Sequence, residues 1–374
     1  MHARITLTWG ALLTVACGAV ATSRADTLTE WQVPFADSQP FKLVASGGSV
    51  FYVNNAFEQH LGRLDVGTSR FTEWPLPFAA TSPCEIVARV GDGALFMTGA
   101  TAGEIAQFDP ASQTLRRWLV ADPDSGPWGL AVDGQGRVLF RAIDATNSRT
   151  FIGRLDTTVG TVTTWLVPDS IATISAGDMA ALPGGSVFFN VFGPTGSFLV
   201  ATLDPASGLF TAWQPPMEPA WAVTADAAGN VYFQEQNPTF AIARLVPASG
   251  ALTEWTPPGF YNDDLAFGFG RVAFGNNDPT GVALLDPTQP GQESTLTPFA
   301  SDAVTPTSVT VTPVVATLTG QEARGHFKRR RVDGVGTGAF TTWAVPSSPR
   351  MVAFAPDGLY FSEGSANAIG RITP

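Results

Sequence analysis

Charged and aromatic residues recur at one position of this sequence, directly before short apolar triplets such as residues 43–45 and 86–88. A tryptophan, Trp128, also precedes one member of this column. Aromatic rings beside a few convergent charged groups are typical of small-molecule sites. The column therefore predicts a site for a small-molecule or peptide ligand, although polar turn residues without a ligand are the alternative. We call it the polar column, and its members are Lys42, Glu85, Gly129, Asp178, Trp221, Asp264, Ser308 and Arg350.

Two glutamates, Glu235 and Glu363, each end a glycine-led aromatic segment. Carboxylate oxygens at the ends of strands can hold a divalent cation, although ordinary solvated carboxylates explain both residues as well. The sequence contains no Gly-x-Ser-x-Gly elbow, phosphate-binding loop or His-Glu-x-x-His motif. We therefore assign no catalytic residue at this point, and Glu235 and Glu363 are the candidate metal ligands.

The elements that position these residues follow from an internal repeat of roughly 45 residues. Its marker is a tryptophan that ends a Thr-Glu-Trp segment or a variant of it, with Leu296 in one degenerate copy. Within the repeat recur an apolar triplet, a glycine-led aromatic segment, a third segment that reads Gly-Arg-Leu at residues 62–64 and 153–155 and Gly-Arg-Ile at 370–372, and the tryptophan segment; together they predict four short strands. The markers are Trp31, Trp74, Trp118, Trp165, Trp213, Trp255, Leu296 and Trp343.

These copies predict an all-β fold, a single β-propeller with eight four-stranded blades. Seven blades are the alternative if residues 296–342 form an insertion. The last copy stops after three strands, whereas residues 27–33 form a fourth strand with no blade of their own. Pairing these two ends would close the ring and leave no exposed sheet edge there.

Composition agrees with many short strands joined by tight turns. The chain is 44% hydrophobic and 14% charged, with 38 Gly and 29 Pro, and no long segment keeps the apolar period of a helix. Its formal net charge of −11 argues against nucleic acid and anionic lipid as partners. We expect a monomer that does not insert into a membrane.

The first 25 residues resemble a secretory signal, with a basic start, an apolar stretch and small residues before position 26. Lipidation at Cys17 is the weaker alternative. Cleavage would leave residues 26–374 as the propeller, with Cys84 as the one remaining cysteine and hence no internal disulfide. We therefore expect a periplasmic or extracellular location.

A basic run, Lys-Arg-Arg-Arg at residues 328–331, is unusual in so acidic a chain. It falls on an expected outer strand. There it would serve as a solvated edge that discourages pairing between sheets, and a docking patch is the alternative.

The repeated pattern Thr-Glu-Trp-x-x-Pro, Pro-x-x-apolar, Gly-x-Tyr-Phe-x-Glu and Ile-Gly-Arg resembles the virginiamycin B lyase (streptogramin lyase) family of β-propellers. The likeness spans essentially the whole chain after residue 25. It implies a seven-bladed ring and a magnesium-dependent elimination that opens a cyclic depsipeptide antibiotic at its ester bond. The count of eight blades departs from that pattern.

The resemblance also implies histidines in a Pro-His-Gly turn and a glutamate at the end of the aromatic strand. Here Trp128 occupies the histidine position of the best-matching turn, and no copy has a histidine there. The glutamate is kept at Glu235 and Glu363, whereas His60 and His326 fall in or before outer strands. We therefore expect a ligand-binding propeller without lyase turnover. The alternatives are a magnesium-dependent carbon–oxygen lyase with a different base and a scaffold for protein partners.

Overall fold

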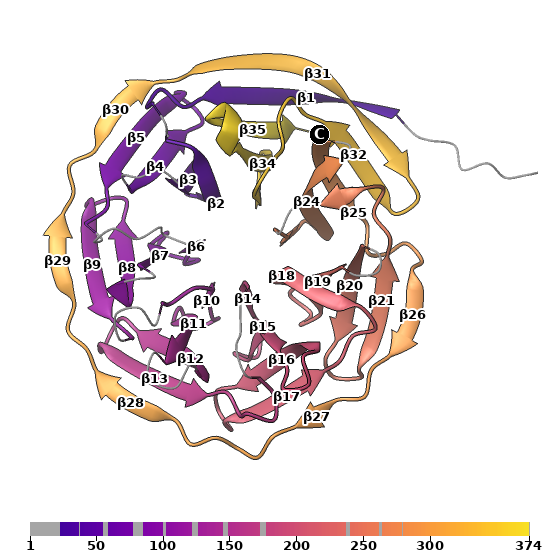
Figure 1. Cartoon of the computed structure of the whole chain (residues 1–374). Helices are drawn as coiled ribbons and strands as arrows, with labels where there is room; N and C mark the ends of the chain where they lie inside the picture. Colours follow the sequence, from indigo (N-terminus) through magenta and orange to yellow (C-terminus); the bar gives the residue numbers. More distant parts are fainter. Residues whose placement is uncertain are drawn as a thin grey trace, which may run out of the picture.

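Short antiparallel strands stand around a central axis in the computed structural model (Figure 1). The structure describes residues 23–373 except 37, 55–58, 78–84, 100–101, 122–125, 145–148, 173–176, 237–239, 262–263 and 279. Cys17, Cys84 and most of the expected signal segment lie outside the described residues. In the part described there is a single 3-10 turn, Gly364–Ala366, and no helix long and apolar enough to cross a membrane.

Each radial set of strands runs outward from the axis in sequence order, with antiparallel neighbours. The last set is completed by β1 from the start of the described chain. The sets are β2 (Pro40–Ser46), β3 (Ser49–Asn54), β4 (His60–Asp65) and β5 (Arg70–Pro75); β6 (Ile86–Ala88), β7 (Leu95–Gly99), β8 (Glu104–Asp109) and β9 (Thr114–Leu119); β10 (Leu130–Val132), β11 (Val138–Asp144), β12 (Arg149–Asp156) and β13 (Thr161–Leu166); β14 (Met179–Ala181), β15 (Val187–Phe192), β16 (Phe198–Asp204) and β17 (Leu209–Trp213); β18 (Glu218–Ala225), β19 (Val231–Gln236), β20 (Ala241–Val246) and β21 (Ala251–Trp255); β22 (Phe260–Tyr261) and β23 (Ala266–Gly268) with β24 (Arg271–Asp278), β25 (Thr280–Leu285) and β32 (Phe340–Ala344); and β33 (Val352–Ala355), β34 (Gly358–Glu363), β35 (Ala368–Thr373) and β1 (Ser23–Gln32).

The recurring glycine of the third strand leaves room for an aromatic ring from the second strand. A Cβ atom added at Gly62 would lie 2.0 Å from Cζ of Tyr52. Gly153 under Phe140 shows the same close approach, at 2.1 Å from Cζ. The glycine signature of the sequence is therefore a packing requirement within each blade.

In four blades an arginine of the third strand lies over the marker tryptophan of the fourth strand; it follows the recurring glycine in three of them, and Arg244 follows Ala243 in the other. Such stacking places a cation on the electron-rich face of the indole and lets the long side chain cover apolar surface. The arginine of the third strand and the tryptophan of the fourth, which recur separately in the sequence, therefore contact each other in the folded blade. The distances from guanidinium carbon to ring centroid are 5.6 Å for Arg63 and Trp74, 5.1 Å for Arg154 and Trp165, 5.5 Å for Arg244 and Trp255, and 5.2 Å for Arg371 and Trp31.

Residues 292–337 do not form a separate blade, which corrects the expectation of eight. They run around the outside of the ring, and we call them the belt (Figure 1). Most belt strands are exposed, with too little apolar surface to build a core of their own. Each adds a fifth strand to an existing sheet, in reverse order along the ring. The belt strands are β26 (Gln292–Thr295), β27 (Phe299–Ala300), β28 (Thr307–Thr310), β29 (Val314–Thr317), β30 (Gln321–Arg324) and β31 (His326–Thr337).

Part of the belt has a seven-residue repeat, in which Val304, Val311, Leu318 and Gly325 occupy equivalent positions. Seven extended residues span about 23 Å, and each repeat takes the belt from one blade to the next. At each of these four positions, and also at Leu296, the backbone N–H donates to the carbonyl of a turn residue that has a positive φ. The bonds are Leu296 to Gly250 (2.7 Å), Val304 to Gly208 (2.9 Å), Val311 to Gly160 (2.6 Å), Leu318 to Gln113 (3.0 Å) and Gly325 to Ser69 (3.1 Å).

The two ends of the described chain pair as expected. Strand β1 lies antiparallel to β35, with Thr27 opposite Thr373. On its other side β1 pairs with β31 over its whole length, and β31 pairs in turn with β32 at Val335–Thr337. Strand β31 of the belt therefore joins the sixth and last groups of strands into one continuous ten-stranded sheet.

Candidate functional site at the channel mouth

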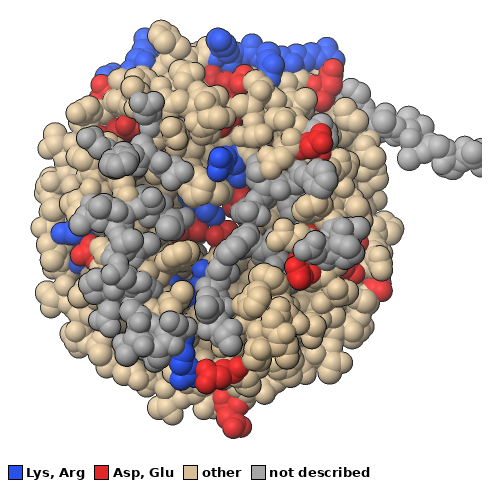
Figure 2. All heavy atoms as spheres, viewed as in Figure 1, with Lys and Arg blue, Asp and Glu red and all other residues tan. Residues whose placement is uncertain are grey.

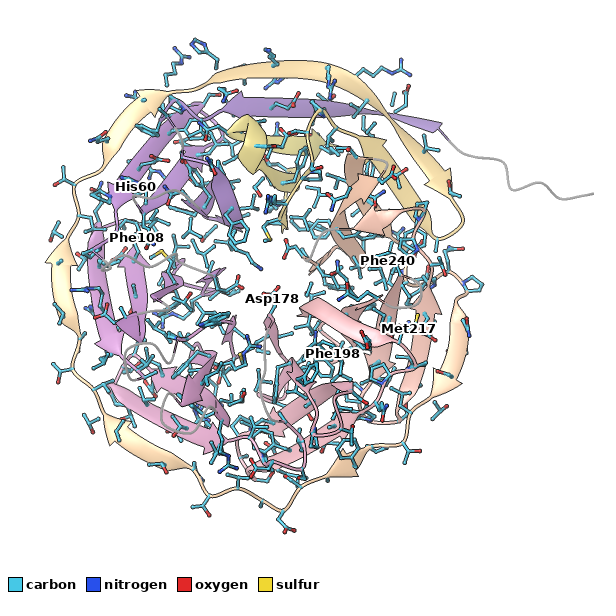
Figure 3. The ribbon with its side chains drawn as sticks, viewed as in Figure 1. His60, Phe108, Asp178, Phe198, Met217 and Phe240 are labelled. Carbon is cyan, nitrogen blue, oxygen red and sulfur yellow. The ribbon has the colours of Figure 1, made fainter. Side chains whose placement is uncertain are left out.

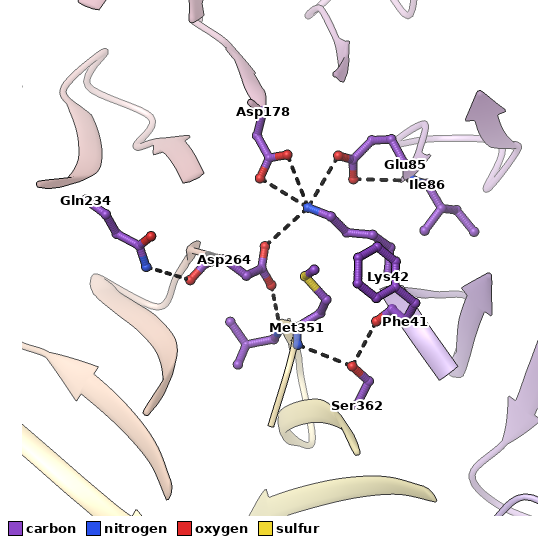
Figure 4. A network of polar contacts seen from close by, with 10 residues as sticks. Phe41, Lys42, Glu85, Ile86, Asp178, Gln234, Asp264, Met351 and Ser362 are labelled. Carbon is purple, nitrogen blue, oxygen red and sulfur yellow. Dashed lines mark hydrogen bonds and ion pairs between the residues drawn. The ribbon is translucent and has the colours of Figure 1, made fainter. Parts of the chain in front are cut away.

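Four members of the polar column meet on the axis of the ring: Lys42, Glu85, Asp178 and Asp264 (Figure 4). Lys42 lies in β2, and the three acids come directly before β6 and β14 and shortly before β23. Because the innermost strands of all blades surround the axis, residues at their starts converge although they are far apart in sequence. We call these four residues the axial cluster.

A single ammonium group connects the cluster. Lys42 Nζ lies 3.3 Å from Glu85 Oε2 and 3.6 Å from Asp264 Oδ1. It donates to both carboxylate oxygens of Asp178, at 3.2 and 3.1 Å. One side chain from the first blade is therefore paired with carboxylates from three other blades.

Backbone contacts hold the carboxylates in place. The Val352 N–H donates to Asp264 Oδ2 at 2.6 Å, and Gln234 Nε2 donates to the Asp264 carbonyl at 3.3 Å. Ser362 Oγ donates to the Phe41 carbonyl at 2.8 Å, beside Lys42. These bonds link neighbouring inner strands, so the cluster is built into the ring.

Burial and charge act in opposite directions in the cluster. Burial by itself lowers the pKa of Lys42, but the three carboxylates raise that pKa well above its ordinary value. Burial raises the pKa of Asp264 to about 6 and that of Glu85 well above its usual range, against the opposing effect of Lys42. Lys42 therefore stays charged at neutral pH, and its ammonium group is shared among three acids.

A second cation, Arg141, lies near the cluster and was not singled out from the sequence. Burial lowers its pKa to about 10, against the charges of Asp178 and Glu85. The sequence does carry a sign of this residue's role, because Arg141 is a charged residue within the largely apolar strand Val138–Asp144. Three carboxyl groups thus face two cations at this end of the channel, and Figure 2 shows charged side chains in the hollow at its centre.

Trp128 provides an aromatic surface beside the cluster. Its side chain is 47% exposed, and its backbone N–H donates to the Arg141 carbonyl at 2.8 Å. The adjoining Gly129 lies so close to the Asp178 turn that a Cβ atom would be 3.0 Å from the Gly177 carbonyl oxygen. Asp178 is also the most exposed acid of the cluster, with 21% of its side chain accessible. Trp128 and Asp178 therefore come from neighbouring turns, one with an exposed ring and the other with a partly exposed carboxylate.

Two other members of the polar column, Ser308 and Arg350, do not join the cluster. Ser308 lies in the belt strand β28, where its hydroxyl is 3.0 Å from Thr163 Oγ1, because its segment is not a blade. Arg350 is exposed and forms no ion pair with the described acids, although its N–H donates to the Ser362 carbonyl. Trp221 belongs to β18, but its side chain is outside the described part.

Glu235 and Glu363 lie in different blades, each beside another acid. Burial, followed by the charge of Glu254, raises the pKa of Glu235 to about 9. Burial likewise raises the pKa of Glu363 to about 7, and Ser347 Oγ donates to its Oε1 at 2.9 Å. Among the described residues no group of three His, Cys, Asp or Glu side chains is placed to hold a metal ion.

The two histidines in the described part of the chain, His60 and His326, lie away from the axial cluster. His60 begins β4, where its N–H donates to Asn54 Oδ1 at 2.8 Å (Figure 3). His326 begins β31 on the belt. Neither imidazole is available to the axial cluster as a base.

The buried Glu235 predicts that stability falls as pH rises. Its pKa is higher in the folded state, about 9, than the ordinary value of 4.5, so folding favours the protonated form. That contribution is complete below the ordinary pKa and declines as pH rises toward 9. Glu235→Gln should therefore melt at a higher temperature than the parent at pH 8.5 and lose less stability between pH 5 and 8.5.

Thermal unfolding of both proteins over this pH range measures the effect. Glu322→Gln, on the exposed strand β30, is the control and should keep the slope of the parent. Equal slopes for the parent and Glu235→Gln would show that Glu235 does not take up a proton on folding.

Comparison with known proteins supports the fold. No protein-family model and no curated protein matches the sequence. Hydrazine synthase from Kuenenia stuttgartiensis is 14% identical over 91% of this chain and 97% of that chain, with a TM-score of 0.61. A chain of the mitotic checkpoint complex is 10% identical over 100% and 97%, with a TM-score of 0.52. The PQQ-bound aldose sugar dehydrogenase from Streptomyces coelicolor is 11% identical over 82% and 99%, with a TM-score of 0.42.

Identities this low show the fold alone. Together with the radial sheets, they show that the chain is an all-β protein of the β-propeller class. These likenesses do not bear on the resemblance to the streptogramin lyases, which stays a prediction.

Proposed function

We propose that this chain is a ligand-binding β-propeller that holds a small molecule with a positively charged group at the mouth of its channel. The observation that carries the proposal is the half-exposed Trp128 beside the axial cluster, where carboxylates outnumber cations. An ammonium or guanidinium group would pair with Asp178, and the apolar part would lie on the indole.

The wider setting of this function is also inferred. The pairing of β1 with β35 and the radial strand sets support a closed ring of seven blades. The pattern of residues 1–25 supports export to the periplasm or the exterior, with the ligand reaching the channel there.

Amine binding can be measured with phenethylammonium as the probe and its neutral analogue phenethyl alcohol as the comparison. We expect a concentration-dependent rise in melting temperature with the amine only, because binding to the folded state stabilises it by mass action. Trp128→Ala and Asp178→Asn should each weaken amine binding about tenfold or more, equivalent to at least 1.4 kcal/mol.

The double variant Trp128→Ala/Trp221→Ala extends the test to the second column tryptophan. Phe299→Ala is the matched control, because Phe299 is a 40% exposed aromatic residue on the belt. If the amine stabilises the parent and the Trp128 variants equally, the ligand does not bind at this mouth.

The lyase alternative has its own direct test. Purified protein is incubated with a streptogramin B and magnesium, and the product is analysed by mass spectrometry. We expect no ring opening, because general acid–base groups contribute about 10²–10⁴-fold and neither described histidine lies at the axial cluster. Turnover that is lost on chelation of magnesium would establish the lyase instead.

A further inference from the structure

The belt ends in a strand unlike the others. Strand β31 has 12 residues, whereas β28, β29 and β30 have 4 each. Its residues 326–331 are all exposed, and four of them are Lys328, Arg329, Arg330 and Arg331. In Figure 2 these basic residues contribute to a blue strip along the rim of the molecule.

Little of this positive charge is neutralised within the molecule. Arg330 lies 3.8 Å from Glu30, and Arg331 lies 3.4 Å from Asp333. Within the described residues Lys328 and Arg329 form no ion pair with an acid, and the Arg329 guanidinium lies 5.1 Å from the exposed ring of Phe327. The strip is thus a local positive surface on a chain of net charge −11.

The backbone of β31 also has an open edge. One edge pairs with β1 along residues 326–335, whereas β32 joins the other edge only from Val335 onward. For residues 326–334 no described strand pairs with that second edge. Its N–H and C=O groups can therefore accept another extended chain.

The belt shows that extended segments can add to edges of this ring. At the other sheets an extended belt segment pairs antiparallel with the fourth strand of a blade, as Val314 does with Arg117. Strand β31 is itself such an added strand, and its outer edge at residues 326–334 could pair with one further extended chain in the same way. Strand addition of this kind takes its affinity from backbone hydrogen bonds and its specificity from side chains.

We propose that the open edge of β31 is a docking site for an extended acidic peptide segment of a partner protein, which adds to the sheet as a further strand. Glutamate or aspartate side chains opposite residues 328–331 form the cross-strand charge pairs, and Phe327 packs against an apolar residue of the partner. A second copy of this chain is disfavoured, because antiparallel pairing of two β31 edges places arginine against arginine.

Other polyanions fit the observations less well. Nucleic acids and anionic lipids have no ladder of N–H and C=O groups to match the open edge. A large anionic surface would also meet the net negative charge of the remaining molecule.

The test uses the full chain and a fluorescent peptide with four consecutive glutamates between valine and threonine residues. Fluorescence anisotropy measures binding, and amide hydrogen exchange reports on β31. We expect salt-sensitive binding, with slower exchange of amides within residues 326–334. The variant Arg329→Glu/Arg331→Glu should weaken binding about tenfold or more, whereas the charge-matched control Arg70→Glu/Arg116→Glu, at exposed residues elsewhere, should not.

Two comparisons separate strand addition from simple charge attraction. A peptide of the same charge with alternating prolines cannot form the ladder and should bind at least about tenfold more weakly. The proposal is overturned if that peptide, heparin or vesicles of anionic lipid bind as tightly as the strand-forming peptide. It is equally overturned if the peptide does not bind, or binds without protecting β31 amides, since the basic run is then a solvated edge or a general polyanion patch.

Discussion

Lys42→Met is expected to lower the free energy of unfolding by about 3–5 kcal/mol, the range found when one partner of a buried ion pair is removed. The substitution keeps the length of the side chain but removes the charge that balances Glu85, Asp178 and Asp264. The remaining carboxylates then repel one another in a buried site, where water solvates them poorly. Denaturant unfolding at pH 7 measures the change.

Two further variants make this result specific. Arg116→Met removes an exposed positive charge and should stay within about 0.5 kcal/mol of the parent. Lys42→Met/Asp178→Asn should recover part of the loss, because it removes one of the unbalanced acids and neighbouring sites are not additive. If Lys42→Met unfolds at the same denaturant concentration as the parent, the axial cluster does not contribute to holding the ring together.

The second large effect concerns the belt. Leu318→Ala should cost about 2 kcal/mol or more, the lower end of the range for truncating a buried leucine. Leu318 is 9% exposed and packs into the apolar cluster that contains Trp74 and Phe108. It therefore joins the belt to the blades through side-chain packing as well as through its backbone bond to Gln113.

The same belt offers a control of matched chemistry. Val315 is 58% exposed, and its replacement by Ala should change the free energy of unfolding by no more than about 0.5 kcal/mol. Denaturant unfolding followed by tryptophan fluorescence compares the two variants. Equal losses for Leu318→Ala and Val315→Ala would mean that the belt's inward positions do not stabilise the ring.

The belt was misread from the sequence although a signal was present. Counting Leu296 as a degenerate copy of the marker tryptophan leads to eight blades, because it assigns the belt segment to a blade of its own. The residues Val304, Val311 and Leu318 follow a shorter, seven-residue period, and each is followed by threonine and then proline or glycine. A period that short cannot hold four strands, and recognising it would have separated the belt from the blades.

The axial cluster was half predictable. The position before each inner strand is the same in every blade, so the convergence of Lys42, Glu85, Asp178 and Asp264 followed from the repeat. The prediction for Ser308 was wrong, because its segment belongs to the belt and not to an inner strand. Arg141 was missed because it comes from the second strand of a blade, and only the packing of inner strands brings it near the acids.

The strands of each blade and the pairing of the terminal strands follow from the repeat in the sequence. These features depend on contacts that recur with the repeat, such as glycine under an aromatic ring and arginine over tryptophan. Tertiary structure alone decided the path of the belt, the ion pairs of Lys42 and the open edge of β31. The physical reason is that these features join residues far apart in the chain, and only the packing of the blades around the axis sets which side chains meet and which strand edge remains unpaired.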